Sequence, residues 1–241
     1  MLPILLGIGV ALALFIFWAE PLFALGALER LSPQLLYRVR TDHKVVGLSF
    51  DDGPVPVFTP QVLDILESHN AKATFFLIGE RAARNPELVA RIKSAGHEVG
   101  NHYSRNGLMV FDSDREFLRN LQRTEAAAGL SDRSASRTKL FRPPGGWARP
   151  RQVELARQRG YITVLGAAYP HDPMRPPVRY IRWLVQKNLA PGTIIILHDG
   201  ISSATRTIQA LPGILAEGSR RGFSFVSIGE LIQHGQACEE R

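Results

Sequence analysis

The sequence of 241 residues has a single cysteine, Cys238, so the chain has no second thiol with which to form an internal disulfide. Its fold must therefore be stabilised by burial of apolar side chains, and the cysteine content leaves the redox compartment open. The chain also lacks internal repeats and low-complexity tracts. Its length suits one domain of ordinary size with a small additional segment.

Acidic residues are outnumbered by basic ones, 22 to 29, which gives a formal net charge of +7. This charge is compatible with anionic polymers, nucleic acid or lipid headgroups as neighbours. The basic residues between positions 133 and 159 lack the interleaved glycine and aromatic side chains that single-strand binders use to stack bases. We interpret them as a solvated basic face and expect no nucleic-acid partner.

Charge is absent from residues 2–19. At a rise of about 1.5 Å per residue, a helix of this length nearly covers a hydrocarbon core of about 30 Å. A cleaved secretory signal is the alternative, but no lysine or arginine precedes the apolar stretch, and residues 24–26 form only a weak cleavage signal. The sequence therefore predicts a transmembrane helix that acts as a membrane anchor or uncleaved signal over 1–28, and a connector over 29–43.

Strand-like and helix-like runs alternate regularly after the connector. Strands are predicted at 45–50, 73–78, 97–101, 138–141, 161–165, 193–197 and 223–228. Helix starts are predicted at Thr59-Pro60, at Asn85-Pro86, at the capping-box pair Ser113 and Glu116, and at Pro150. A further helix over 204–221 is expected to be interrupted near Pro212-Gly213.

This alternation indicates an α/β fold with a parallel sheet and helices outside it. Residues 44–235 supply about 190 residues for seven strand–helix units, whereas a full eight-fold barrel typically needs about 250. The sequence therefore predicts a distorted, incomplete (β/α)7 barrel over 44–235, and a short tail over 236–241.

Two adjacent carboxylates end the first of these strands, in Leu48-Ser49-Phe50-Asp51-Asp52-Gly53-Pro54. Where the backbone turns at Gly53-Pro54, neighbouring side chains can enter one pocket from different directions. One carboxylate could then hold a cation while the other takes a proton. A solvated turn is the alternative explanation for the same residues.

Other chemically active residues follow the ends of the later strands. These are Asn101-His102, then Arg142 and Trp147, then His171-Asp172, and finally His198-Asp199. In barrels of this kind the active site is built where the strands end. Because three of the seven histidines occur at or just beyond these ends, the sequence predicts that they join the acidic residues in one site.

These motifs, in this order, resemble those of the NodB-homology polysaccharide deacetylases, also called carbohydrate esterase family four. Members of that family remove N- or O-acetyl groups from chitin oligomers, peptidoglycan and related glycans. The resemblance spans residues 44–233. It implies a divalent metal, most often Zn²⁺, with Co²⁺ or Mn²⁺ as alternatives. A bound metal of this kind lowers the pKa of water to about 7 and polarises the acetyl carbonyl.

The resemblance also implies a role for each matching residue. Asp51 would be the base and Asp52 a metal ligand, His102 would be a second ligand, and Arg142 would orient the base. His198 would be the general acid. Substrate-binding roles fall to the backbone N–H of Gly145 or its neighbour, to Tyr103, and to Trp147, which either stacks on a sugar ring or is buried in the barrel rim.

Two motifs depart from the family pattern. Asn106 stands where many members have a second histidine ligand, and a neutral amide oxygen is a weaker Zn²⁺ donor than imidazole. The site would then hold metal loosely, prefer another cation, or recruit Asp112 or Asp114 as a third ligand. The other departure, Tyr169-Pro170-His171-Asp172-Pro173, resembles a subgroup with a Tyr-Pro-x-Asp-Pro fourth motif. There Asp172 would tune Arg142 or His198, and the choice between His171 and Asp172 stays open.

The predicted activity is metal-dependent removal of acetyl groups from an N-acetylated glycan. One alternative is hydrolysis of small non-glycan amides, which would require a closed pocket, and another is a metal-free, membrane-anchored pseudoenzyme that binds glycan. Arg30, Arg38 and Arg40 follow the predicted span and by themselves favour a cytoplasmic domain. Because a polymer of the cell wall lies outside the plasma membrane, we nevertheless expect the domain on the extracytoplasmic side. The sequence predicts no oligomeric state.

Overall fold

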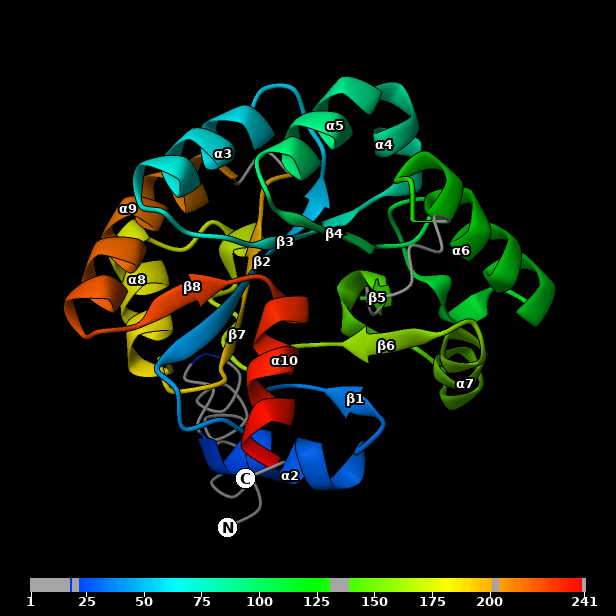
Figure 1. Cartoon of the computed structure of the whole chain (residues 1–241). Helices are drawn as coiled ribbons and strands as arrows, with labels where there is room; N and C mark the ends of the chain where they lie inside the picture. The colour runs from blue at the N-terminus through cyan, green and yellow to red at the C-terminus, as the bar shows by residue number, and fades with distance from the viewer. Residues whose placement is uncertain (1–17, 19–21, 131–138, 201–203, 240–241) are drawn as a thin grey trace, which may run out of the picture. The chain divides into compact units, whose positions relative to one another are not determined.

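The computed structural model describes residue 18 and residues 22–130, 139–200 and 204–239 (Figure 1). The chain divides into two compact units, residues 1–33 and 34–241. The described part of the first unit contains one ten-residue helix, α2 (Leu22–Leu31). None of the helices in the described ranges has the length and apolar character needed to cross a membrane. Most of the predicted anchor, residues 1–17 and 19–21, lies outside the described residues.

The second unit is built on one sheet in which every strand pair is parallel. The strand order is β1-β6-β5-β4-β3-β2-β7, and β8 pairs with β2. The strands are β1 (Leu35–Leu36), β2 (Val45–Gly53), β3 (Thr74–Leu77), β4 (Glu98–Asn101), β5 (Lys139–Phe141), β6 (Tyr161–Val164), β7 (Ile194–His198) and β8 (Ser224–Val226). The parallel sheet is confirmed, and β1 adds a short strand within the segment predicted to be a connector.

Helices lie outside the curved sheet, as Figure 1 shows for α3 to α9. Their bounds are α3 (Thr59–Ser68), α4 (Gly79–Arg84), α5 (Pro86–Ser94), α6 (Asp114–Ala127), α7 (Pro150–Gln158), α8 (Val178–Lys187), α9 (Ala204–Arg220) and α10 (Ile228–Glu239). The capping box of Ser113 and Glu116 is confirmed at the start of α6. Helix α10 continues into the segment predicted as a tail, and α4 is a short helix that the sequence patterns did not predict.

The predicted interruption of α9 is wrong. The helix runs through Pro212 without a break, although proline in a helix interior removes a hydrogen bond and usually kinks the axis. Buried side chains stand on both sides of the proline, including Leu211, Ile214 and Leu215. Burial of this apolar face stabilises the helix enough to offset the local loss.

The barrel is incomplete, as predicted, and its opening lies between β1 and β7, the two ends of the strand order. Two isolated bridges lie at this opening: one joins Arg38, beyond β1, to Thr193, and the other joins Ala168, beyond β6, to Ile195 of β7. Strand β1 lies on the edge of β6 away from β5, where Leu36 pairs with Val164. The chain between β1 and β2 therefore forms part of the barrel wall, which is more than the connector that the sequence predicted.

Strand β2 pairs with three other strands, β3, β7 and β8, and all nine of its residues are buried. Asp51 is in register with His198 of β7 and with Phe76 of β3, and an irregularity in the β3 pairing follows at Asp52. Asn101 of β4 is in turn in register with Phe141 of β5, the residue before Arg142. The register therefore brings the predicted site residues of four strand ends to the same edge of the sheet.

Candidate active site

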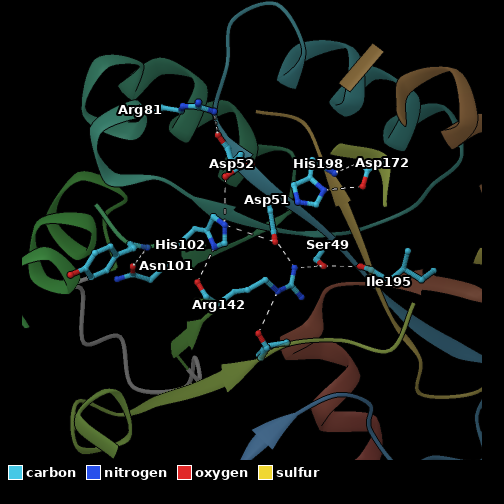
Figure 2. Close-up of polar contacts among 12 residues, drawn as sticks. Ser49, Asp51, Asp52, Arg81, Asn101, His102, Arg142, Asp172, Ile195 and His198 are labelled. Atoms are coloured by element: carbon cyan, nitrogen blue, oxygen red, sulfur yellow. Dashed lines mark hydrogen bonds and ion pairs between the residues drawn. The ribbon is translucent and has the colours of Figure 1, made fainter. Parts of the chain in front are cut away.

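Asp51 is held by a buried arginine. Arg142 Nη1 donates to Asp51 Oδ1 at 2.6 Å and to Ser49 Oγ at 2.8 Å, and its guanidinium lies 4.1 Å from the centre of the Phe76 ring (Figure 2). Burial raises the pKa of Asp51, but the positive charge of Arg142, with His102 and His198, outweighs burial and leaves that pKa below its usual value. The carboxylate is therefore ionised and fixed in orientation.

His102 presents one ring nitrogen to the two aspartates. Its Nδ1 lies 2.8 Å from the carbonyl oxygen of Arg142, and since a carbonyl only accepts hydrogen bonds, Nδ1 carries the proton. The Nε2 lone pair then faces Asp52 Oδ1 at 3.6 Å and Asp51 Oδ2 at 4.0 Å. Two ligands of one tetrahedral Zn²⁺ ion lie about 3.4 Å apart, so Asp52 and His102 fit a shared cation.

A third strong ligand is not present among the described residues, where no group of three or more His, Cys, Asp or Glu side chains is placed to hold a metal ion. Asn106 lines the same cavity as Asp52 and His102, from an exposed loop. Asp112 instead accepts from Tyr103 at 2.5 Å and from Arg105 at 2.6 Å, and Asp114 pairs with Arg151. The structure therefore does not bring either acid to the predicted metal site.

His198 is paired with Asp172. His198 Nδ1 lies 2.9 Å from Asp172 Oδ1, and the other oxygen, Oδ2, accepts from the His198 backbone N–H and from Thr207 Oγ1. Burial by itself lowers the pKa of His198, but Asp172, together with Asp51 and Asp52, raises that pKa to about 9. Of the two residues between which the sequence left the choice open, Asp172 contacts His198, whereas His171 packs against Tyr169.

The described residues enclose a cavity of about 440 Å³ between these groups. Figure 2 shows His102 and His198 on either side of Asp51, which places the polar groups around one space. The lining residues are Tyr37, Asp51, Asp52, His102, Asn106, Arg142, Pro143, Gly145, Gly146, Leu165, Gly166, Tyr169, Pro173, Ile196 and His198. Of these, Asn106, Gly145 and Gly146 are exposed, so the cavity opens to solvent.

The three predicted substrate-binding residues have different positions. Gly145 lines the cavity at a turn with φ of +64°, where glycine is favoured. Trp147 follows it and is 70% exposed, which rules out burial in the barrel rim. Tyr103 is fully buried, stacks on Phe117 and donates its hydroxyl to Asp112. The structure therefore places Tyr103 in the core and not with the other site residues.

Several residues near the site had no role in the sequence prediction. Tyr37 and Tyr169 line the cavity, and Ser49 supports Arg142 while donating to the Ile195 carbonyl at 2.7 Å. Ser49 could have been singled out in the sequence, because it is a polar residue in the otherwise apolar run 45–50. Tyr37 belongs to the predicted connector and carried no signal.

Helix α3 begins at Thr59, as predicted, but the Thr59 hydroxyl does not cap it. The capping position is Phe58, and the Thr59 hydroxyl instead donates to Asp199 Oδ2 at 2.5 Å. Asp199 is fully buried beside His198, and burial, only partly opposed by the Thr59 hydrogen bond, raises its pKa to about 7. The Thr59 hydroxyl thus donates to a buried carboxyl group that is far away in the sequence. Such a tertiary contact is not predicted by local capping rules.

Comparison with known proteins identifies the family. The polysaccharide deacetylase family matches residues 38–164. The chain is 39% identical over 202 residues to a peptidoglycan-N-acetylglucosamine deacetylase of Bacillus cereus, covering 82% of this chain and 92% of that protein. It is 34% identical over 193 residues to a chitooligosaccharide deacetylase of Sinorhizobium fredii, covering 76% and 89%.

A solved structure shows the same fold. BA3943 of Bacillus anthracis, described as a CE4 family pseudoenzyme, superposes with a TM-score of 0.75 at 30% identity, covering 86% of this chain and 72% of that one. This chain belongs to the polysaccharide deacetylase family, whose enzymes are hydrolases of carbon–nitrogen bonds other than peptide bonds. The predicted resemblance is confirmed at the level of the family.

Proposed function

We propose that this chain is a metal-dependent deacetylase of an N-acetylated glycan of the peptidoglycan or chitin-oligomer type. The observation that supports this most directly is the arrangement of two separately held charge pairs, Asp51 with Arg142 and Asp172 with His198, around one open cavity. A base and an acid with different protonation states on either side of one cavity are what hydrolysis of an amide requires.

Asp52 and His102 would hold the divalent metal, with Asn106 as a weaker third donor from the cavity rim. Zn²⁺ is the proposed ion, and Co²⁺ and Mn²⁺ are alternatives with the same ligand types. When bound, the metal would lower the pKa of water and polarise the acetyl carbonyl. The proton on His102 Nδ1 stays on that atom, because it is donated to the Arg142 carbonyl.

The acid and base roles follow from the charges. Asp51 is ionised beside Arg142, so its carboxylate takes the proton of the attacking water. His198 is charged at neutral pH because Asp172 raises its pKa, so it donates a proton to the leaving amine. The backbone N–H at Gly145 is the proposed donor to the oxyanion, and Trp147 offers an exposed ring on which a sugar stacks.

Two other functions deserve a test. A hydrolase of small non-glycan amides needs a closed pocket, and the exposed residues at the cavity mouth favour a glycan over that alternative. A metal-free, glycan-binding pseudoenzyme is favoured by the weak donor at Asn106. Against it, a protein that only binds glycan has no need for the buried His198–Asp172 pair.

One experiment separates these functions. The metal content of the purified chain is measured, and acetate release is followed with chitin oligomers, with peptidoglycan and with a small N-acetylated amine. Bound metal with acetate release from either glycan supports the proposal. Tight glycan binding without metal or acetate identifies a pseudoenzyme, and release from the small amine alone identifies the other hydrolase.

We further propose that the N-terminal segment anchors the protein and that the domain lies outside the plasma membrane, since its proposed substrates are there. Protease treatment of intact spheroplasts should degrade the domain. Full protection of the domain, with degradation only after the membrane is broken, would refute this orientation.

A further inference from the structure

Arg81 of α4 reaches across the end of the sheet to two strand ends. Its Nη1 donates to the backbone carbonyl of Asp52, near the end of β2, and also to that of Gly200, beyond β7 (Figure 2 shows the first of these contacts). Gly200 follows His198 by two residues. One half-buried guanidinium therefore bridges the segment with the proposed metal ligand and the segment with the proposed acid.

The backbone at Asp52 is in an uncommon conformation. Asp52 has a φ of +70°, in the left-handed region that residues other than glycine adopt infrequently, asparagine and aspartate more often than the rest. The neighbouring carbonyls of Asp51 and Gly53 accept from the backbone N–H groups of Asp199 and Ile78. The carbonyl of Asp52, which lies between them, accepts a hydrogen bond from the Arg81 side chain instead.

Helix α4 is itself fixed to the loop that carries His102. The backbone N–H groups of Gly79 and Glu80 donate to the carbonyls of Tyr103 and Ser104, each at 2.9 Å. A Cβ on Gly79 would lie 2.5 Å from the Thr124 hydroxyl, so the start of α4 fits closely against α6. Arg81 therefore belongs to a helix that is hydrogen-bonded to the loop that carries His102.

We propose that Arg81 is a positioning residue that sets the separation between Asp52 and His102, and so the affinity of the metal site, from outside the cavity. This inference rests on the proposed function for the identity of the metal ligands. The bridge acts by holding the left-handed Asp52 backbone at a fixed place relative to α4 and the His102 loop. It also fixes the β7 end against the β2 end, where a Cβ on Gly200 would lie 1.9 Å from the Asp52 carbonyl oxygen.

The test compares Arg81→Gln and Arg81→Lys with Arg84→Gln in the full chain. Arg84 lies in the last turn of the same helix and is exposed, so it is a matched control for loss of a positive charge. Zn²⁺ and Co²⁺ dissociation constants, the Co²⁺ absorption spectrum, and kcat and KM are measured, with urea unfolding as a stability reference. We expect Arg81→Gln to weaken metal binding by roughly 10- to 100-fold, because loss of groups that support ligands has effects of this size.

Arg81→Lys keeps a positive donor and should recover part of the affinity, whereas Arg84→Gln should match the wild type. The fall in activity should appear in kcat at limiting metal and be largely restored at saturating metal, with KM for the glycan little changed, since Arg81 does not line the cavity. Equal metal affinity and an unchanged Co²⁺ spectrum in Arg81→Gln would overturn the inference. An equal loss in Arg84→Gln would overturn it as well.

A crystal structure of Arg81→Gln without added metal gives a readout that depends neither on metal nor on activity. We expect the Asp52 backbone to leave its positive φ or the β2 and β7 ends to separate; a structure in which both are unchanged would overturn the role of Arg81. If the wild type binds metal but releases no acetate, the proposed function fails, and the metal affinities of the variants still test Arg81.

Discussion

The two sides of the cavity are built differently. On the proposed acid–base side (Asp51, Arg142, Asp172 and His198), every residue is buried and each charge meets an opposite charge within hydrogen-bonding distance. On the proposed metal side (Asp52, His102 and Asn106), Asp52 Oδ1 and His102 Nε2 lie 3.6 Å apart and the third proposed donor is an exposed amide. The acid–base side therefore keeps its geometry without a ligand, whereas the metal side depends on its surroundings and on the ion.

The largest expected effect is on the acid–base side. Asp51→Asn keeps the shape of the side chain but removes the proton acceptor, so kcat should fall by about 10²–10⁴-fold. Metal affinity should change little, because Asp52 and His102 remain. Steady-state kinetics and metal titration of the same preparation check this prediction.

Asp52→Asn and Asp114→Asn complete the comparison. Asp52→Asn should release the metal and with it the activity, whereas Asp114→Asn alters an exposed carboxylate and should leave both unchanged. If Asp51→Asn loses the metal and Asp52→Asn keeps it, the roles of the two aspartates are reversed.

Asp172→Asn tests how strongly the acid–base side is held, and we expect a smaller loss of roughly 10- to 100-fold in kcat/KM. His198 donates a proton only while charged, so wild-type activity should fall as pH rises through about 9. Burial lowers the pKa of His198, and the Asp172 carboxylate is the main group that opposes this effect. Removing its charge should therefore lower the pKa of His198. The alkaline limb of the pH profile should then move to lower pH.

The same pair contributes to folding. Because the pKa of His198 is raised from 6.5 to about 9, its stabilisation is complete below 6.5 and is lost as pH rises through about 9. Thr207→Val is the matched control, since it removes one hydrogen bond to Asp172 but keeps the charge. It should leave the alkaline limb in place, and an unmoved limb in Asp172→Asn as well would exclude Asp172 as the group that sets this pKa.

The sequence predicted one side of the cavity better than the other for a physical reason. Parallel strands bring their ends to one edge, so the strand pattern alone gathers Asp51, Arg142 and His198. The support of these residues comes from contacts between distant segments, such as Thr207 with Asp172 and Arg81 with Asp52, which no local pattern specifies. Tyr103 was misassigned because its place next to His102 did not reveal that its side chain turns into the core.

The fold shows the same division. Alternating strands and helices predicted the parallel, incomplete barrel, since periodicity reports which face of each element is buried. The patterns did not predict β1, because a pair of residues is too short to show a period, and its pairing with β6 is a contact across more than a hundred residues. Helix α4 was missed because six residues that begin with glycine carry little helix signal.

The smallest expected effect concerns the weak donor of the metal side. Asn106→His places an imidazole on the exposed loop that lines the cavity beside Asp52 and His102, and imidazole is a stronger Zn²⁺ ligand than an amide. The Zn²⁺ dissociation constant, measured by competition with a chelator, should fall by about tenfold or more. Activity should rise less, because the acid–base side is unchanged and sets the rate once the metal is bound.

Asn106→Ala is the matched control for the same loop. If the amide oxygen is a ligand, the alanine variant should bind Zn²⁺ more weakly than the wild type, so that affinity increases from alanine to asparagine to histidine. Equal affinities in all three proteins would contradict a role for position 106 and would mean that Asp52 and His102 hold the ion with another donor. The metal side would then be as complete as the acid–base side, and the contrast between them would be wrong.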